Sequence, residues 1–285
     1  MASESESQLK AAGPLGSFFR VMEKELTGVF GADANALVVL NRVAFLNVSR
    51  GVKMEEGGKR ALLDWACATG LGQERGASAD LVAAVSARRA AALRALSGSA
   101  GERHVLRLRA EPEWRMAVGL GTKANAHEIG LALHGTYGWP VIPGPALKGL
   151  VRSWAVSSGV PDAEIARVLG GAAPAAQGTV RFLDAMPDSK PVSVVADVMT
   201  PHVKPYYDHL AGSAPRAAPA EYHNPVPLPF LTVRGGYAVD LWGPDPDDLS
   251  LAAHWLAAAG DELGAGAKTA AGYGYLAVTR VPEAS

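Results

Sequence analysis

The spacing of apolar residues changes near residue 101, and this change constrains the fold more than any other feature of the chain. Before it, the spacing is that of amphipathic helices, which we expect over residues 18–30, 34–46, 59–68 and 79–96, with no strand among them. After it, Leu106 and Leu108 alternate with Arg107 and Arg109, as in a strand with one buried face. We therefore expect a helical N-terminal region over residues 1–100 and a second domain over residues 101–285.

The second region mixes strands with helices. Two helices are expected, over residues 145–158 and 249–263, and the expected strands are 103–109, 114–120, 131–134, 178–184, 193–199, 228–234, 237–242 and 273–280. Without insertions, the order is strand, helix, strand, strand, helix, strand. This order predicts an α+β fold with a ferredoxin-like (RNA-recognition-type) sheet, long loop insertions and a helical N-terminal region. The irregular segments 121–130 and 201–227 are the expected places of partner contacts.

Composition narrows the class of protein. The single cysteine, Cys67, cannot form a disulfide within the chain, and the N-terminus lacks the pattern of a secretory signal. The longest apolar stretch, residues 36–48, is interrupted by Asn41 and Arg42 and is too short to span a bilayer. We expect a soluble cytoplasmic protein with no membrane partner.

Charge is distributed unevenly along the chain although the net charge is only −1. Residues 75–152 contain 11 Lys and Arg against 5 Asp and Glu, whereas residues 153–285 contain 8 against 14. Such asymmetry suits a protein with one basic face for nucleic acid and one acidic face for a basic partner. Alternatively, the two halves fold together and their charges intermix on the surface.

A glycine-spaced loop over residues 264–274 contains a single Lys-Thr pair, Lys268 and Thr269. Glycine lets backbone amides approach an anion closely and accepts positive φ, so this loop is able to surround a phosphate. The loop does not fit the nucleotide-triphosphate pattern, because Ala267 and Glu262 stand where that pattern requires glycines. It does not fit the dinucleotide pattern either, because Thr269 stands where that pattern requires a glycine. The alternative is a tight helix-to-strand connection that binds nothing.

A second candidate site lies at the start of the helix expected over residues 145–158. Prolines precede it, Gly144 is the expected N-cap, and Lys148 and Arg152 share its flank four residues apart. Free amides at a helix start beside two cations form a site for a phosphate, although a solvated flank would have the same sequence. One face of the strand expected over residues 103–109 carries three arginines, Arg103, Arg107 and Arg109. They form either a third phosphate-binding surface or the charges that keep an exposed edge strand from pairing with other strands.

The two glycine- and proline-containing motifs resemble those of a known family. GWPVIPGPALKGLVR at residues 138–152 and LGAGAKTAAGYG at residues 263–274 are similar to the paired motifs of the RAMP superfamily of CRISPR proteins. Between them, DVMTPH at 197–202 and PVPLPFL at 225–231 resemble the sixth-subunit family of the Cmr (type III-B) RNA-guided complexes. The resemblance extends over residues 100–280, and a helical N-terminal part also suits that family.

The resemblance implies a noncatalytic RNA-binding and assembly subunit of a Cmr interference complex, which caps the filament near the 3′ part of the guide. Its implied partners are guide RNA, target RNA and neighbouring RAMP subunits, with no cofactor. Lys148, Arg152 and Lys268 would contact phosphates, while the glycines shape the loop. Residues 121–130 would separate stacked nucleotides. The candidate RNA-binding residues are Lys148, Arg152, Lys268, Thr269, Gly264, Gly266, Gly272, Gly274, Arg107, Arg109 and Lys123.

Two enzymatic alternatives stay open. Some relatives cleave RNA, so His202, if it met Asp197, or else His127 would be the base of a metal-independent endoribonuclease that processes guide RNA. A small-phosphate enzyme that uses the glycine loop is the other. The remaining histidines show no metal-ligand spacing, and there is no cysteine pair, so no metal is expected.

Overall fold

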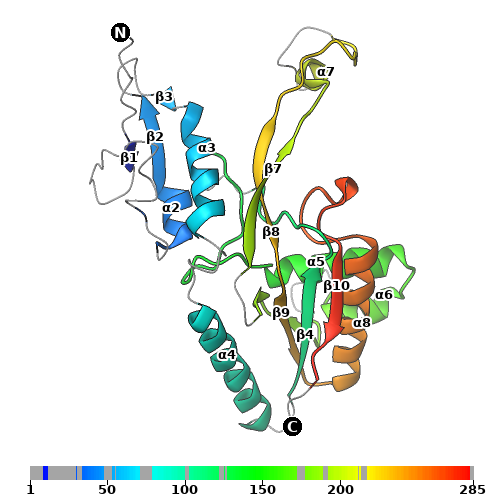
Figure 1. The fold of residues 1–285 in the computed structure, drawn as a ribbon. Helices are drawn as coiled ribbons and strands as arrows, with labels where there is room; N and C mark the ends of the chain where they lie inside the picture. Colours follow the sequence, from blue (N-terminus) through cyan, green and yellow to red (C-terminus); the bar gives the residue numbers. More distant parts are fainter. Residues whose placement is uncertain are drawn as a thin grey trace, which may run out of the picture.

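The computed structural model describes residues 9–11, 30, 34–47, 53–54, 56–70, 79–99, 103–121, 125, 127–171, 177–188, 192–210, 212 and 217–282. In Figure 1, a sheet with helices lies below, a long two-stranded arm rises from it, and the N-terminal elements lie beside the arm. No helix within these residues is long and apolar enough to cross a membrane.

The main sheet is antiparallel and has the order β10–β4–β9–β5. Its members are β4 (His104–Pro112), β5 (Arg181–Phe182), β9 (Tyr237–Gly243) and β10 (Leu276–Arg280), and β6 (Met186–Pro187) also pairs with β9. The prediction of a mixed fold with an antiparallel sheet is confirmed. Since β4 lies between β10 and β9, the edge-strand interpretation of its arginines is wrong.

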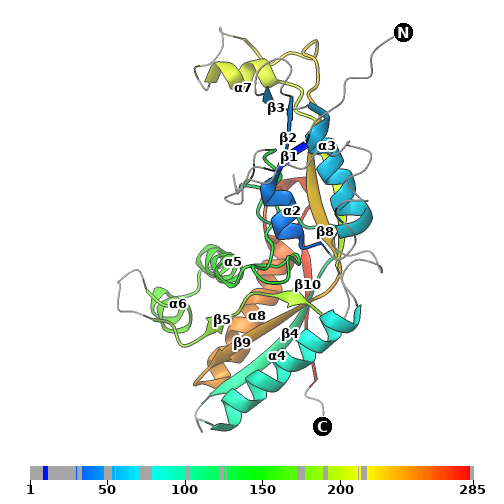
Figure 2. The same cartoon turned by 90° about the vertical axis from the view of Figure 1, so that its left-hand side faces the viewer.

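Side chains along β4 point alternately to the two faces of the main sheet, and different helices cover these faces. Leu106 and Leu108 are buried on one side with α8 (Pro246–Glu262), and α5 (Gly144–Ser157) packs beside α8. The opposite side, which carries Arg107, faces α4 (Ala79–Ser99), and Figure 2 shows α4 in front of the sheet with α8 behind it. Helices thus cover both faces of the sheet.

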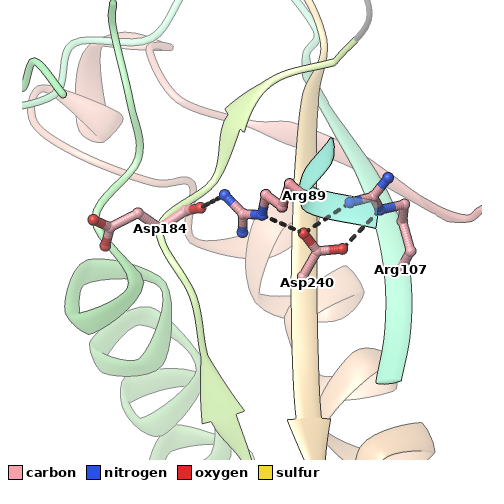
Figure 3. Close-up of polar contacts among 4 residues, drawn as sticks. All are labelled: Arg89, Arg107, Asp184 and Asp240. Atoms are coloured by element: carbon pink, nitrogen blue, oxygen red, sulfur yellow. Dashed lines mark hydrogen bonds and ion pairs between the residues drawn. The ribbon is translucent and has the colours of Figure 1, made fainter. Parts of the chain in front are cut away.

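A buried carboxylate attaches α4 to this sheet (Figure 3). Asp240 of β9 has a fully buried side chain and accepts two bonds from Arg107, with N–O distances of 2.7 and 3.1 Å. Arg89 of α4 lies 2.7 Å from the same carboxylate and donates at 2.8 Å to the carbonyl of Asp184. Two guanidinium groups therefore share one buried acid, and α4 depends on that pairing for its position.

The arm consists of β7 (Ser193–Met199) and β8 (Leu228–Arg234), which are paired along their full length, with α7 (Lys204–Leu210) near its far end (Figure 1). Both strand ranges agree with the prediction. Gly235 and Gly236 join two strands of different sheets, β8 of the arm and β9 of the main sheet.

The N-terminal part differs from the prediction because it contains strands. It comprises β1 (Leu9–Ala11), α2 (Ala36–Arg42), β2 (Val43–Asn47), β3 (Lys53–Met54) and α3 (Glu56–Trp65), which continues as a π-helical turn, Ala66–Gly70. The helix expected over residues 34–46 ends at Arg42, where Val43 becomes extended and pairs with Ala11. Pairing with a distant strand overrides the local helical pattern. The helix expected over residues 18–30 lies, apart from Phe30, outside the described residues.

Several expected strands are shorter than predicted or absent. Residues 114–120 and 131–134 form only isolated bridges, such as Met116 with Val233 and Leu133 with Pro140, and the strand expected over 178–184 is reduced to β5. Gly119, with φ of 84°, interrupts the first of these runs. Helix α6 (Asp162–Leu169) and α7 were not predicted. Buried residues of α2, α3, the arm and the main sheet belong to one continuous core.

Candidate nucleic-acid interface

The start of α5 is not a free anion site. Its N-cap is Pro143 rather than Gly144, and the Gly144 N–H donates to the carboxylate of Asp184 at 2.7 Å. A carboxylate therefore already occupies the position where free amides were expected to receive a phosphate. Gly144 is required for a different reason, since a Cβ there would lie 2.3 Å from the carbonyl oxygen of Phe182.

The flank of α5 instead forms one wall of a basic cleft of about 620 Å³. Lys148 and Arg152 line it from α5, and Arg181 of β5 lines it from the other side. The rest of the lining comes from Pro145, Gly149, Leu169, Gly170, Gly171, Gln177 and Gly178. Lys148 and Arg152 are thus brought together as predicted, whereas Arg181, 29 residues further along the chain than Arg152, was missed.

Electrostatics in this cleft favour an anion. Burial lowers the pKa of Lys148, and the charges of Arg152 and Arg181 lower it further. Arg152 donates to the carbonyl of Gly170, and Arg181 donates to the carbonyl of Gly178 and to Gln177. Those acceptors are neutral, and none of the described lining residues is acidic. A bound phosphate would offset the mutual repulsion of these three cations, which no acidic residue among the described lining residues neutralises.

The glycine loop is shaped by close backbone packing. The Ala265 N–H donates to the Gly274 carbonyl at 2.7 Å, and the Ala267 N–H donates to the Ala117 carbonyl at 2.7 Å. All four glycines named from the sequence have positive φ: Gly264, Gly266, Gly272 and Gly274. Added Cβ atoms at Gly266 and Gly274 would lie 2.3 and 2.0 Å from backbone oxygens. The tight-connection interpretation therefore describes the geometry of this loop.

The two loop glycines Gly274 and Gly272 make a matched pair for mutation. Both have positive φ, of 83° and 88°, but a Cβ at Gly272 meets nothing within 4 Å. We expect Gly272→Ala to lower the free energy of unfolding by about 1 kcal/mol, from backbone strain alone. Gly274→Ala should cost several-fold more, because the backbone must also move. Urea unfolding of both variants measures this difference, and equal losses would contradict the close packing.

Lys268 belongs to a different cluster from the cleft. It has φ of 63°, its Nζ lies 3.4 Å from Sδ of Met199, and it lies 4.9 Å from the ring centre of Phe230 on the arm. Thr269 begins the short 3₁₀ turn that follows it. Lys268 therefore sits where the loop meets the arm, and Lys148 sits where α5 meets β5.

A second network joins the same loop to the arm. The carboxylate of Asp197 accepts from Arg115 at 2.6 Å and from the Tyr273 hydroxyl at 2.8 Å. Burial alone would raise the pKa of Asp197, but the hydrogen bonds from Tyr273, Val198 and Arg115 and the charge of Arg115 together lower it. Burial and the bond to Asp197 raise the pKa of Tyr273 to about 12. At neutral pH, Asp197 is therefore charged and Tyr273 neutral.

The two sequence motifs are linked through one intervening strand-like segment, residues 115–118. Gly274 and Ala267 bond to the backbone of Arg115 and Ala117, and Ala132 bonds to Val118 on the same segment. Ala132 in turn accepts from Val141, which belongs to the proline-containing approach to α5. The motifs thus share a scaffold, while their cations occupy the two separate clusters described above.

The other predicted residues have different surroundings. Arg107 pairs with Asp240, and Arg109 pairs with Glu111 at 2.5 Å and Asp188 at 3.4 Å, so both arginines already have carboxylate partners. Lys123 lies outside the described residues. His127 is buried, and burial and the charge of Lys59 lower its pKa. Buried His127 is poorly placed to separate nucleotides, and the role proposed for residues 121–130 stays a prediction.

The candidate catalytic pair does not form within the described residues. His202 is exposed near the end of β7, while Asp197 is bound by Arg115 and Tyr273. No group of three His, Cys, Asp or Glu in the described part of the chain is arranged to hold a metal ion. The described residues of the segment 201–227 include the exposed side chains of Tyr207, Leu210 and Tyr222. Its role in partner contacts stays a prediction.

Comparison with known proteins identifies the class. The family model of the RAMP superfamily matches residues 98–277, and the chain belongs to this superfamily. It is 26% identical over 235 residues to the CRISPR system Cmr subunit Cmr6 of Pyrococcus furiosus. The match covers 61% of this chain and 68% of that protein. A chain of the cryo-EM structure of the Type III-B Cmr-beta complex bound to cognate target RNA shares its fold. That match has a TM-score of 0.60 and 18% identity, and it covers 79% of this chain and 74% of the other.

Proposed function

We propose that this chain is a noncatalytic RNA-binding and assembly subunit of a type III-B (Cmr) CRISPR interference complex in the cytoplasm. It corresponds to the sixth subunit, caps the filament near the 3′ part of the guide RNA, and contacts the guide–target duplex and neighbouring RAMP subunits. The main sheet is assigned to the ferredoxin-like class, because β10–β4–β9–β5 is the order in which a strand–helix–strand–strand–helix–strand unit forms such a sheet.

The observation that carries this proposal is the basic cleft between α5 and β5. Lys148, Arg152 and Arg181 converge there without an acidic lining residue among those described, which suits the phosphates of an RNA strand. The lining offers cations, backbone groups and a single side-chain amide, so binding would depend little on base sequence. Family membership and the similarity to Cmr6 agree with this assignment.

A noncatalytic role is supported by the surroundings of the two candidate bases. Asp197 is engaged by Arg115 and Tyr273 rather than His202, and His127 is buried. We expect purified protein incubated with repeat RNA, without metal, to leave it intact. Cleavage by the wild type that disappears in His202→Ala would favour the endoribonuclease alternative and contradict our proposal.

RNA binding itself is tested by titrating labelled single-stranded RNA at several salt concentrations. We expect affinity to fall as salt rises, because each neutralised phosphate releases counterions, and to change little with RNA sequence. Free nucleotides serve as the comparison. Stabilisation of the protein against heat by nucleotides but not by RNA would favour the small-phosphate enzyme and contradict the proposal.

A further inference from the structure

Trp114 presents a large aromatic surface to solvent near the place where the main sheet meets the arm. It lies two residues beyond β4 and is 50% exposed, the only tryptophan among the exposed large apolar side chains that the structure describes. Trp114 does not belong to the basic cleft. A half-exposed indole offers a flat apolar surface with a polar edge, on which an aromatic ligand is able to stack.

The Trp114 ring is held in place by its neighbours. Tyr273 lies 5.0 Å away between ring centres, at an interplanar angle of 37°, and the Arg115 guanidinium lies 4.9 Å from the centre of the indole. Tyr273 and Arg115 are themselves fixed by their shared bonds to Asp197. Phe230 of the arm packs edge-on against Tyr273 at 5.6 Å. Because these neighbours already orient the ring, a ligand that covers it would lose little entropy in ordering it.

Charges around the ring favour an anionic ligand with an aromatic part. The Arg115 guanidinium lies over the indole, and Lys268 lies over Phe230, which packs against Tyr273, whose hydroxyl is neutral at pH 7. A purely apolar protein segment would have to cover these cations. A nucleotide instead offers a flat base for the indole and a phosphate for Arg115 and Lys268.

We infer that Trp114 stacks on an unpaired nucleobase of the bound RNA, with the phosphate of that nucleotide near Arg115 and Lys268. This inference rests on the proposed RNA binding and adds a second point of contact, separate from the cleft of Lys148. Every base has a flat aromatic face, so stacking at Trp114 is compatible with binding that ignores sequence.

The test uses single-stranded RNA with 2-aminopurine at successive positions and compares Trp114→Ala with Trp114→Phe. Wild-type protein should quench fluorescence at one register of positions, Trp114→Ala should abolish this quenching, and Trp114→Phe should retain part of it. Trp114→Ala should weaken RNA affinity roughly tenfold. The slope of affinity against salt should stay unchanged, because no cation is removed. Leu96→Ala, which removes another half-exposed apolar side chain, on α4, should change neither quantity.

The outcomes distinguish a failure of stacking at Trp114 from a failure of the proposed RNA binding. If Trp114→Ala keeps wild-type quenching and affinity while loss of the cleft cations weakens binding, stacking is wrong and RNA binding stands. If Trp114→Ala binds RNA normally but no longer enters a reconstituted complex, the ring contacts protein and stacking is again wrong. If the wild-type protein binds no RNA at all, both proposals fall.

Discussion

Asp240→Asn should lower the free energy of unfolding by about 3 kcal/mol or more, the largest stability loss that we expect from a single polar substitution in this chain. Asparagine retains the size of the side chain but removes the charge that Arg89 and Arg107 share at 2.7 Å. Both guanidinium groups are mostly buried and would lose their buried counter-ion. Urea unfolding measures the loss, and limited proteolysis should show earlier cleavage in α4.

Asp64→Asn provides the matched control. Asp64 pairs with Arg60 at 3.6 Å, but both side chains are largely exposed, at 68% and 86%. Exposed pairs of this kind contribute at most about 0.5 kcal/mol, so the control should unfold nearly as the wild type does. A loss below about 1 kcal/mol for Asp240→Asn would mean that the buried pairing contributes no more than surface charge does.

Lys148→Gln combined with Arg181→Gln should weaken binding of single-stranded RNA by roughly 10- to 100-fold at low salt. Each substitution keeps a polar but shorter side chain and removes one of the cations that line the cleft. Two fewer phosphate contacts should also reduce the slope of log affinity against log salt by about 1.4. Filter binding or fluorescence anisotropy at four or five salt concentrations gives both quantities.

Arg60→Gln combined with Arg94→Gln removes the same net charge from α3 and α4, where both arginines are exposed. This control should leave the salt slope unchanged. If the cleft variant and the control weaken binding equally, the protein responds to total charge rather than to the cleft, and the assignment of Lys148 and Arg181 is wrong.

Local pattern was sufficient for much of the fold. Strict alternation located β4, runs rich in apolar residues located β7 and β8, and the prolines before residue 145 marked the beginning of α5. The strands of the N-terminal part were not predicted, and the pairing of β2 with β1 joins segments that are distant in the chain. Val43, at the end of α2, becomes extended only because Ala11 lies beside it. Short local windows contain no trace of such pairing.

The candidate site was predicted in part for a similar reason. Lys148 and Arg152 are four residues apart on one helix, so helical spacing alone places them together. The pairing of β5 with β9 places Arg181 at the same cleft. The bridge between Ile142 and Ala185 places the Asp184 carboxylate beside the first amide of the same helix. The partner of Arg107, Asp240, is 133 residues away along the chain, so no local pattern indicates their pairing.

Asp184 contacts both α4 and α5. Its carboxylate holds the first amide of α5, and its carbonyl receives the Arg89 guanidinium from α4. A displacement of α4 would pull on the residue that sets where α5 begins, and with it the wall that carries Lys148. A movement of α4 would thereby change the width of the basic cleft from the other side of the sheet.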